Sequence, residues 1–207
     1  MRELIKWLHG SLVFDRRISA IADAIGTHLR SGEQLLDIGC GSGRLAVLLR
    51  ERIGNLQVTG VETSVRVGTP IQVTHYDGRR LPFPDGSFDV SLLVDVLHHA
   101  GDALAVLDEA RRVSRRAVIV KDHLRAGWWS HRVLSFMDWV GNAPHGVDSR
   151  YHYFDTDEWA RILSGAGLRV VVRNEQLGLY PWPVRMLFER NYHFLALLEP
   201  TRETIRS

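Results

Sequence analysis

Short apolar runs alternate with helical patterns through the first 123 residues. The run from Leu35 to Ile38 fits a strand that is buried on both faces. Strands are predicted at 34–38, 56–61, 71–76, 88–97 and 117–120, and helices at 15–29, 44–52 and 103–113, the last capped by Asp102. Strands that alternate with helices over this length indicate a parallel sheet with right-handed crossovers.

The pattern is less regular at the two ends of the chain. Residues 1–13 form a short amphipathic segment, and residues 124–153 are rich in aromatic side chains without a clear strand. Asp155 and Glu158 have the spacing of a capping box for a helix to residue 166. Strands follow at 168–172 and 193–198, and an irregular or helical connection lies between them at 178–192. Strands this close in sequence can pair antiparallel.

The first strand ends in Asp37, Gly39, Gly41 and Gly43, with the pattern D-x-G-x-G-x-G. Alternating glycines allow a sharp turn and a close ligand, and the next helix offers free N–H groups. Arg44 stands where a dinucleotide fingerprint needs its last glycine, and no P-loop is present. The Asp37 carboxylate can accept a hydrogen bond from an ammonium group. This favours a nucleotide-like cofactor that carries an amino acid.

The other parallel strands also end in polar residues, and such ends converge on the ligand crevice of an open α/β sheet. Glu62 is placed to accept from both ribose hydroxyls of a nucleoside. Asp77 can accept from an adenine amino group. The predicted crevice therefore has partners for both ends of such a cofactor.

Composition excludes several other classes of protein. The chain has 207 residues, of which 45% are hydrophobic, enough for one globular domain with a full core. The net charge is only +2 and the arginine pairs are dispersed, so a nucleic-acid partner is not expected. Cys40 is the single cysteine, which excludes an internal disulfide and a multi-cysteine zinc site. Without a signal sequence or an apolar run of about 20 residues, we expect a cytoplasmic protein.

The successive motifs resemble those of class I S-adenosylmethionine-dependent methyltransferases, in the small-molecule branch called type 11. The resemblance covers about residues 15–123 and includes the glycine turn, Glu62, the segment 75–78, and the segment 81–89 running into 94–99. It implies a Rossmann-like three-layer α/β sandwich with a seven-stranded, mostly parallel sheet and an antiparallel last strand. Residues 114–117 replace the family's usual Lys-Pro-Gly-Gly turn, which should shift a surface loop.

The resemblance also assigns the S-adenosylmethionine site. The backbone of the glycine turn should border the methionine part of the cofactor. The end of the second strand should border the ribose and the end of the third strand the adenine. The end of the fourth strand should lie beside the sulfonium. The predicted cofactor-binding residues are Asp37, Gly39, Cys40, Gly41, Gly43, Glu62, Thr63, Asp77, Gly78, Val94 and Asp95.

Methyl transfer needs a general base only if the acceptor must lose a proton. His99, at the strand end beside the sulfonium, is the first candidate, and His123, one strand over, is the second. A metal site built from His98, His99 or His123 is not expected, because the histidines lack ligand spacing on one helix. Acceptor-orienting residues are predicted at Asp138, Trp139, Asn142, His145 and Tyr151.

We read the chain as a single domain. It comprises N-terminal helices (1–30), a cofactor-binding core (31–123), an acceptor segment or lid (124–153), and a C-terminal helix with strands (154–207). Trp128 and Trp129 in the lid favour an apolar or aromatic small-molecule acceptor, including a lipid presented at a membrane surface. The alternatives are a non-catalytic S-adenosylmethionine-binding regulatory module and an NAD-dependent oxidoreductase. The oligomeric state is not predicted.

Overall fold

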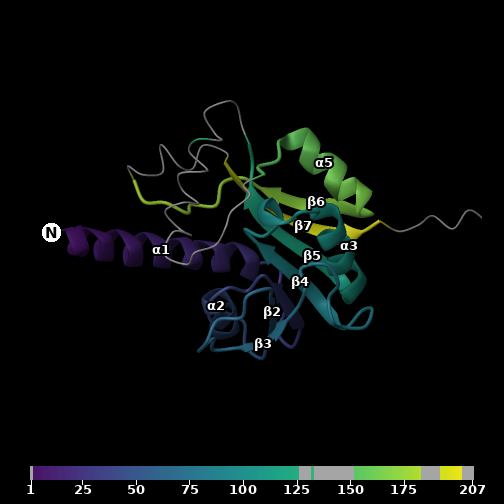
Figure 1. Cartoon of the computed structure of the whole chain (residues 1–207), viewed down its shortest axis with the longest axis horizontal. Coiled ribbons are helices and arrows are strands. Elements are labelled where there is room, and N and C mark those ends of the chain that lie inside the picture. The colour runs from purple at the N-terminus through teal and green to yellow at the C-terminus, as the bar shows by residue number, and fades with distance from the viewer. Residues whose placement is uncertain (1, 126–131, 133–151, 183–191, 202–207) are drawn as a thin grey trace, which may run out of the picture.

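The computed structural model describes residues 2–125, 132, 152–182 and 192–201. Figure 1 shows a central sheet between helices, with α1 extending beyond it. The helices are α1 (Arg2–Gly26), α2 (Arg44–Arg52), α3 (Ala103–Val113), α5 (Thr156–Gly165) and the short 3₁₀ helix η1 (Leu97–His99). The strands are β1 (Gln34–Ile38), β2 (Gln57–Glu62), β3 (Gln72–His75), β4 (Phe88–Val94), β5 (Ser114–His123), β6 (Leu168–Asn174) and β7 (His193–Pro200).

The seven strands form one sheet in the order β3-β2-β1-β4-β5-β7-β6. The five strands from β3 to β5 pair in parallel, and β7 pairs antiparallel with both of its neighbours. The predicted α/β class, the seven strands and the antiparallel last strand are therefore confirmed. The strand order reverses between β1 and β4, so the crevice of this sheet lies beyond the carboxyl ends of these two strands.

Two apolar layers cover the sheet. On one face, Ile21, Ala22 and Ile25 of α1 and Leu49 of α2 pack against Leu35 and the strands beside it. On the other face, α3 and α5 pack against side chains that alternate with those along the same strands. Trp159 of α5 is fully buried in this second layer and its Nε1–H donates to the His123 carbonyl at 3.0 Å. The prediction that Trp159 is a core residue is confirmed.

Helix boundaries follow the expected local signals. Asp102 caps α3 by accepting from the Ala105 N–H at 3.0 Å. Asp155 and Glu158 form the predicted capping box at the start of α5, with hydrogen bonds of 2.8 and 2.9 Å. Both caps satisfy N–H groups that the first helical turn leaves free, so they fix where each helix begins.

Three elements differ from the sequence-based expectation by three residues or more. The N-terminal region is one continuous helix, α1, which ends at Gly26 rather than at Leu29. The strand expected at 88–97 ends at Val94, because Asp95 adopts a left-handed backbone (φ 56°) and η1 follows. Residues 114–117 form no shifted loop but begin β5, where the Ser114 hydroxyl donates to the Ala110 carbonyl at 2.6 Å.

Several predictions concern residues outside the described ranges. The lid tryptophans lie there, as do all five predicted acceptor-orienting residues, Asp138, Trp139, Asn142, His145 and Tyr151. Trp182 is described and is 77% exposed, so it is not part of the core. Among the described residues, none of the helices is long and apolar enough to span a membrane.

Candidate functional site

The glycine turn between β1 and α2 has a left-handed backbone at each of its three alternating glycines. The φ angles are 72° at Gly39, 54° at Gly41 and 72° at Gly43. A Cβ on Gly39 would lie 2.6 Å from Val96, and one on Gly43 would lie 2.8 Å from Thr69, whereas the space at Gly41 is open. Two of the glycines are therefore required by packing. Gly41 instead leaves room beside the backbone, which is what a bound ligand needs.

Glu62, at the end of β2, binds this turn. Its Oε2 accepts from the Gly41 N–H at 2.9 Å, and its Oε1 accepts from the Thr63 N–H at 2.9 Å. Each carboxylate oxygen can accept a second hydrogen bond, so Glu62 can serve ligand hydroxyls while it holds the turn. The half-buried Glu62 thus joins the end of β2 to the glycine turn after β1.

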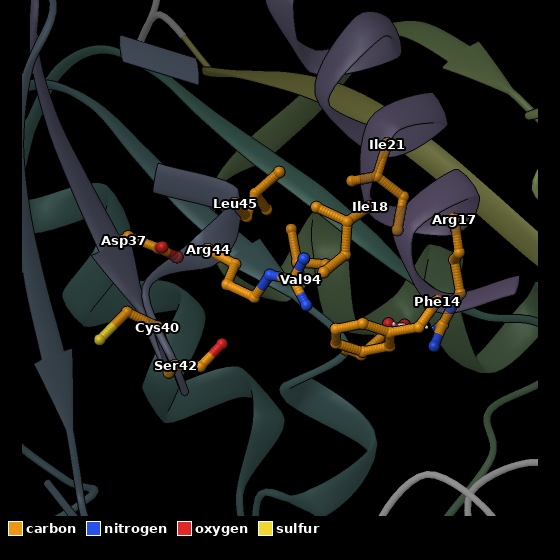
Figure 2. Close-up of a pocket in the computed structure, with 12 residues that line it drawn as sticks. Phe14, Arg17, Ile18, Ile21, Asp37, Cys40, Ser42, Arg44, Leu45 and Val94 are labelled. Carbon is orange, nitrogen blue, oxygen red and sulfur yellow. Dashed lines mark hydrogen bonds and ion pairs between the residues drawn. The ribbon is translucent and has the colours of Figure 1, made fainter. Parts of the chain in front are cut away.

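A pocket of about 140 Å³ lies between the glycine turn and α1. Figure 2 shows Phe14, Arg17, Ile18 and Ile21 of α1 on one side and Asp37, Cys40, Ser42, Arg44 and Leu45 on the other. Val94 and Asp95, at the end of β4, complete the lining. The pocket thus opens at the predicted crevice, and one of its walls is a helix that the sequence did not assign to it.

Asp37 is the buried acid of this pocket, only 3% exposed. Burial and the neighbouring Glu62 carboxylate raise the pKa of Asp37 to about 7. Burial, with Asp37 and Glu62 nearby, also raises the pKa of the Cys40 thiol to about 12, so this thiol is protonated and no nucleophile. A cation placed beside Asp37 would stabilise its ionised form.

The end of β3 supplies a second, more exposed part of the crevice. Asp77 is exposed, and its Oδ1 accepts from the Arg79 and Arg80 N–H groups at 2.9 and 3.0 Å. These backbone hydrogen bonds lower the pKa of Asp77. A Cβ on Gly78 would lie 3.4 Å from Thr63, so the ends of β2 and β3 adjoin. The predicted adenine and ribose residues are therefore brought together.

Asp95 carries an ion-pair cluster at the end of β4. Its carboxylate binds Arg17 of α1 at 2.6 Å and the fully buried Lys121 of β5. Burial acts to raise the pKa of Asp95, but the charges of Lys121 and Arg17 hold it well below its usual range. Burial conversely lowers the pKa of Lys121, against the opposing effect of Asp95. Asp95 therefore links α1 to the sheet beside the pocket.

A buried histidine cluster lies next to this ion-pair cluster. His98 Nδ1 is 2.6 Å from Asp122 Oδ1, and both side chains are 1% exposed. The other oxygen of Asp122, Oδ2, accepts from the Leu97 N–H at 3.0 Å. Burial acts to raise the pKa of Asp122, but the His98 imidazole and the hydrogen bonds from His123 hold it well below its usual range. Asp122 thus orients the His98 ring.

The two histidines predicted from the sequence flank this pair. The ring of His99 lies 3.9 Å from that of His98, and the ring of His123 lies 4.7 Å from it. His123 is 1% exposed, and burial lowers its pKa. His99 is only partly buried. Arg17, Lys121 and Asp122 were missed as site residues, and His98 was named only as a metal ligand that was not expected. The His98-His99 and Lys121-Asp122-His123 strand ends were nevertheless visible in the sequence.

The central part of the chain matches the model of a known protein family. The family model described as a methyltransferase domain matches residues 36–120, from β1 into β5. The match includes the glycine turn, Glu62, Asp77 and Asp95. Asp122 and the whole of α1 lie outside it.

Curated relatives match about two fifths of the chain. The 27-O-demethylrifamycin SV methyltransferase of Amycolatopsis mediterranei is 35% identical over 100 residues, 42% of this chain and 36% of that protein. The demethylmenaquinone methyltransferase of Staphylococcus epidermidis is 34% identical over 97 residues, 42% of this chain and 40% of that protein. The chain thus matches about two fifths of the length of these relatives.

Similarity to solved structures extends over more of the chain. A crystal structure of an S-adenosylmethionine-dependent methyltransferase from Aquifex aeolicus matches with a TM-score of 0.59 and 17% identity. The match covers 86% of this chain and 88% of that one. At this identity the similarity shows the fold alone, and it includes more than the segment that the family model matches.

Proposed function

Because residues 36–120 belong to the methyltransferase domain family, we propose that this chain transfers a methyl group from S-adenosylmethionine to a small-molecule acceptor. The observation that carries the proposal is the glycine turn. Its middle residue, Gly41, leaves open space beside a backbone held by Glu62, and Asp37 lies buried next to it. The named activities of the relatives, on demethylrifamycin and demethylmenaquinone, support a small acceptor.

The residues of the crevice fit the parts of this cofactor. Asp37 would accept from the ammonium group, Glu62 from the ribose hydroxyls, and Asp77 from the adenine amino group. Gly39, Cys40 and Val94 line the pocket, and Gly43, Thr63, Gly78 and Asp95 adjoin these partners. When bound, S-adenosylmethionine supplies an electrophilic methyl group on a positively charged sulfur.

The chain's own part in such a reaction is mainly alignment and exclusion of water. The side chains of α1 cover the pocket, and the ion pair of Arg17 with Asp95 fixes this helix at the end of β4. An acceptor would enter beyond Val94, where the sheet ends. In-line displacement requires the acceptor atom to lie opposite the sulfur, so the position of α1 limits the direction of approach.

The His98–Asp122 pair is the base that the geometry favours over His99 and His123. At 2.6 Å, the Asp122 carboxylate holds a proton on His98 Nδ1, which leaves Nε2 as the atom that can accept one. His123 lies farther from the same oxygen, at 3.5 Å. This base would act on an acceptor hydroxyl or an acidic carbon.

Replacement of His98 by asparagine is expected to lower kcat about 100-fold while the Kd for S-adenosylmethionine changes little, because base catalysis typically contributes 10² to 10⁴. Single-turnover rates and calorimetric titration measure the two effects separately. His99→Asn is the matched control, since its ring lies beside His98 without the short contact to Asp122. A large loss of kcat in His99→Asn with none in His98→Asn would restore His99 as the base.

The Glu62→Gln variant tests the ribose assignment. An amide has a single acceptor oxygen, and its NH₂ group would face the N–H of either Gly41 or Thr63. We expect cofactor affinity to fall about 30-fold, the loss of one to two hydrogen bonds to a charged group. Glu199→Gln, in a surface pair with Arg169, is the control. Unchanged affinity in Glu62→Gln would remove Glu62 from the cofactor site.

The acceptor is proposed to be apolar or aromatic, on the strength of the tryptophans at 128 and 129, which lie outside the described residues. Flotation with liposomes tests whether it is presented at a membrane surface. We expect the intact chain to float with anionic vesicles and the Trp128→Ala, Trp129→Ala double variant to float less. Absence of flotation by the intact chain would exclude a membrane-presented lipid.

A further inference from the structure

Three side chains at the carboxyl ends of β4 and β5 bring potential metal-ligand atoms close together. The nearest such atoms are His98 Nδ1, His123 Nδ1 and Asp122 Oδ1. Their separations are 2.6 Å between His98 and Asp122, 3.5 Å between His123 and Asp122, and 3.5 Å between the two imidazoles. All three side chains are 1% exposed. Two imidazoles and one carboxylate are a donor set that suits zinc and its neighbours in the first transition row.

Two of the three separations match the size of such an ion, since tetrahedral ligands 2.1 Å from zinc lie about 3.4 Å apart. A point equidistant from the three atoms lies about 1.9 Å from each of them in their common plane, and an ion about 0.9 Å out of this plane would lie about 2.1 Å from each. The third pair, His98 Nδ1 and Asp122 Oδ1, would move apart from 2.6 Å when the ion replaces the proton between them.

The backbone fixes the central ligand in advance. Asp122 Oδ2 accepts from the Leu97 N–H at 3.0 Å, and Oδ1 accepts from the His123 N–H at 2.7 Å. Asp122 and His123 are adjacent at the end of β5, and His98 lies on η1. Hydrogen bonds of this kind, from groups around a site to its ligands, orient the ligands and increase metal affinity.

The charges around the cluster nearly balance. Lys121 and Arg17 are positive, and Asp95 lies between them and the cluster, with its Oδ1 3.6 Å from His123 Nδ1. The carboxylates of Asp95 and Asp122 offset these two cations. A divalent ion would therefore enter a site that is close to neutral, with Asp95 as its nearest additional anion.

We propose that His98, His123 and Asp122 bind a late first-row divalent cation, with Zn²⁺ as the reference ion, in place of the proton between His98 and Asp122. The ion joins η1 to the end of β5. A metal on Nδ1 leaves the proton of the neutral imidazole on Nε2, so the metal-bound His98 is unable to accept a proton. Bound metal therefore inhibits any methyl transfer that uses His98 as the base. Only this inhibition rests on the proposed function.

Metal binding is tested on the full chain without cofactor or acceptor. After removal of metals with a chelator, the chain is titrated calorimetrically with Zn²⁺, and Co²⁺ is added as a probe that shows visible absorption when bound by nitrogen and oxygen ligands. We expect one ion per chain with a Kd below about 10 µM. We also expect the melting temperature to rise by about 5 °C at 100 times the Kd.

Variants identify the ligands. His123→Ala and Asp122→Asn are expected to lose at least about 100-fold in affinity, whereas His75→Ala, at an exposed site on β3, should bind as the intact chain does. Circular dichroism shows which variants fold. If the intact chain does not bind the metal, the proposal is wrong. It is also wrong if folded His123→Ala binds Zn²⁺ as tightly as the intact chain does. If the metal binds but does not inhibit methyl transfer, the metal site is supported and His98 is excluded as the base.

Discussion

The Asp37→Asn variant is expected to bind S-adenosylmethionine about 100-fold more weakly than the intact chain and yet to be more stable above pH 7. Asp37 is the buried carboxylate of the pocket, and an amide there would lose a charge-assisted contact with the ammonium group. Such a contact contributes about 2 to 3 kcal/mol, which corresponds to a loss of about 100-fold. Calorimetric titration of the intact chain and of Asp37→Asn with S-adenosylmethionine at pH 8 measures the loss of affinity.

The gain in stability follows from the pKa of Asp37, which folding raises from 3.8 to about 7. The folded state therefore binds this proton more tightly than the unfolded state, and ionisation opposes folding increasingly from about pH 4 to pH 7. Above pH 7 the cost reaches about 4 kcal/mol for a shift of this size. Asparagine does not ionise. Its advantage in unfolding free energy should be largest at pH 8 and should shrink towards pH 4, as urea denaturation of the cofactor-free proteins measures.

The same ionisation predicts pH-dependent binding by the intact chain. If binding requires ionised Asp37, affinity should increase about tenfold between pH 6 and pH 8, with release of a proton at the lower pH. Glu62 faces Asp37, and Arg17 and Arg44 line the same pocket with their charges paired to Asp95 and Asp15. Persistence of the full pH dependence in Asp37→Asn would assign it to another group.

The Gly41→Ala variant is expected to lose cofactor binding by about 100-fold or more with only a small loss of stability. The added methyl group meets no protein atom within 4 Å, so it would occupy the open space beside the turn. Its left-handed backbone, φ 54°, costs about 1 to 2 kcal/mol when a side chain is added. If Gly41→Ala folds but does not bind S-adenosylmethionine, the space beside Gly41 is part of the cofactor site.

Gly86→Ala is the matched control. Gly86 has nearly the same backbone, φ 59°, with only an ordinary 3.6 Å contact to Arg115, and it lies before β4, at the opposite end of the sheet. Both variants should therefore lose similar stability in thermal denaturation, and only Gly41→Ala should lose binding. Gly39→Ala should instead destabilise the fold strongly, because its Cβ would clash with Val96 at 2.6 Å. Equal binding by Gly41→Ala and Gly86→Ala would contradict the assignment.

Much of the cofactor half of the site could be predicted because its signals are local. The apolar run before Asp37, the alternating glycines and the acid at Glu62 each constrain the chain within a few residues. Parallel pairing then places the ends of successive strands at one edge of the sheet. The Asp102 cap of α3 and the capping box of α5 were equally visible, since each depends on residues three apart.

One boundary that was wrong, the end of β4, depended on distant contacts. The apolar pattern of β4 continues past Val94, but Asp95 leaves the strand with a left-handed backbone, where its carboxylate binds Arg17 and Lys121. These partners are 78 and 26 residues away in the sequence. No pattern within the strand indicates that its end is set by such partners.

The sequence by itself determined the α/β sheet, the glycine turn and the acids of the cofactor crevice, because periodicity, turn geometry and strand ends are properties of neighbouring residues. Only the tertiary structure placed α1 over the pocket and joined His98 to Asp122, 24 residues later. The physical reason is that a buried polar side chain must find its partner across the core. That partner is fixed by strand register and helix packing, which the residues around His98 do not encode.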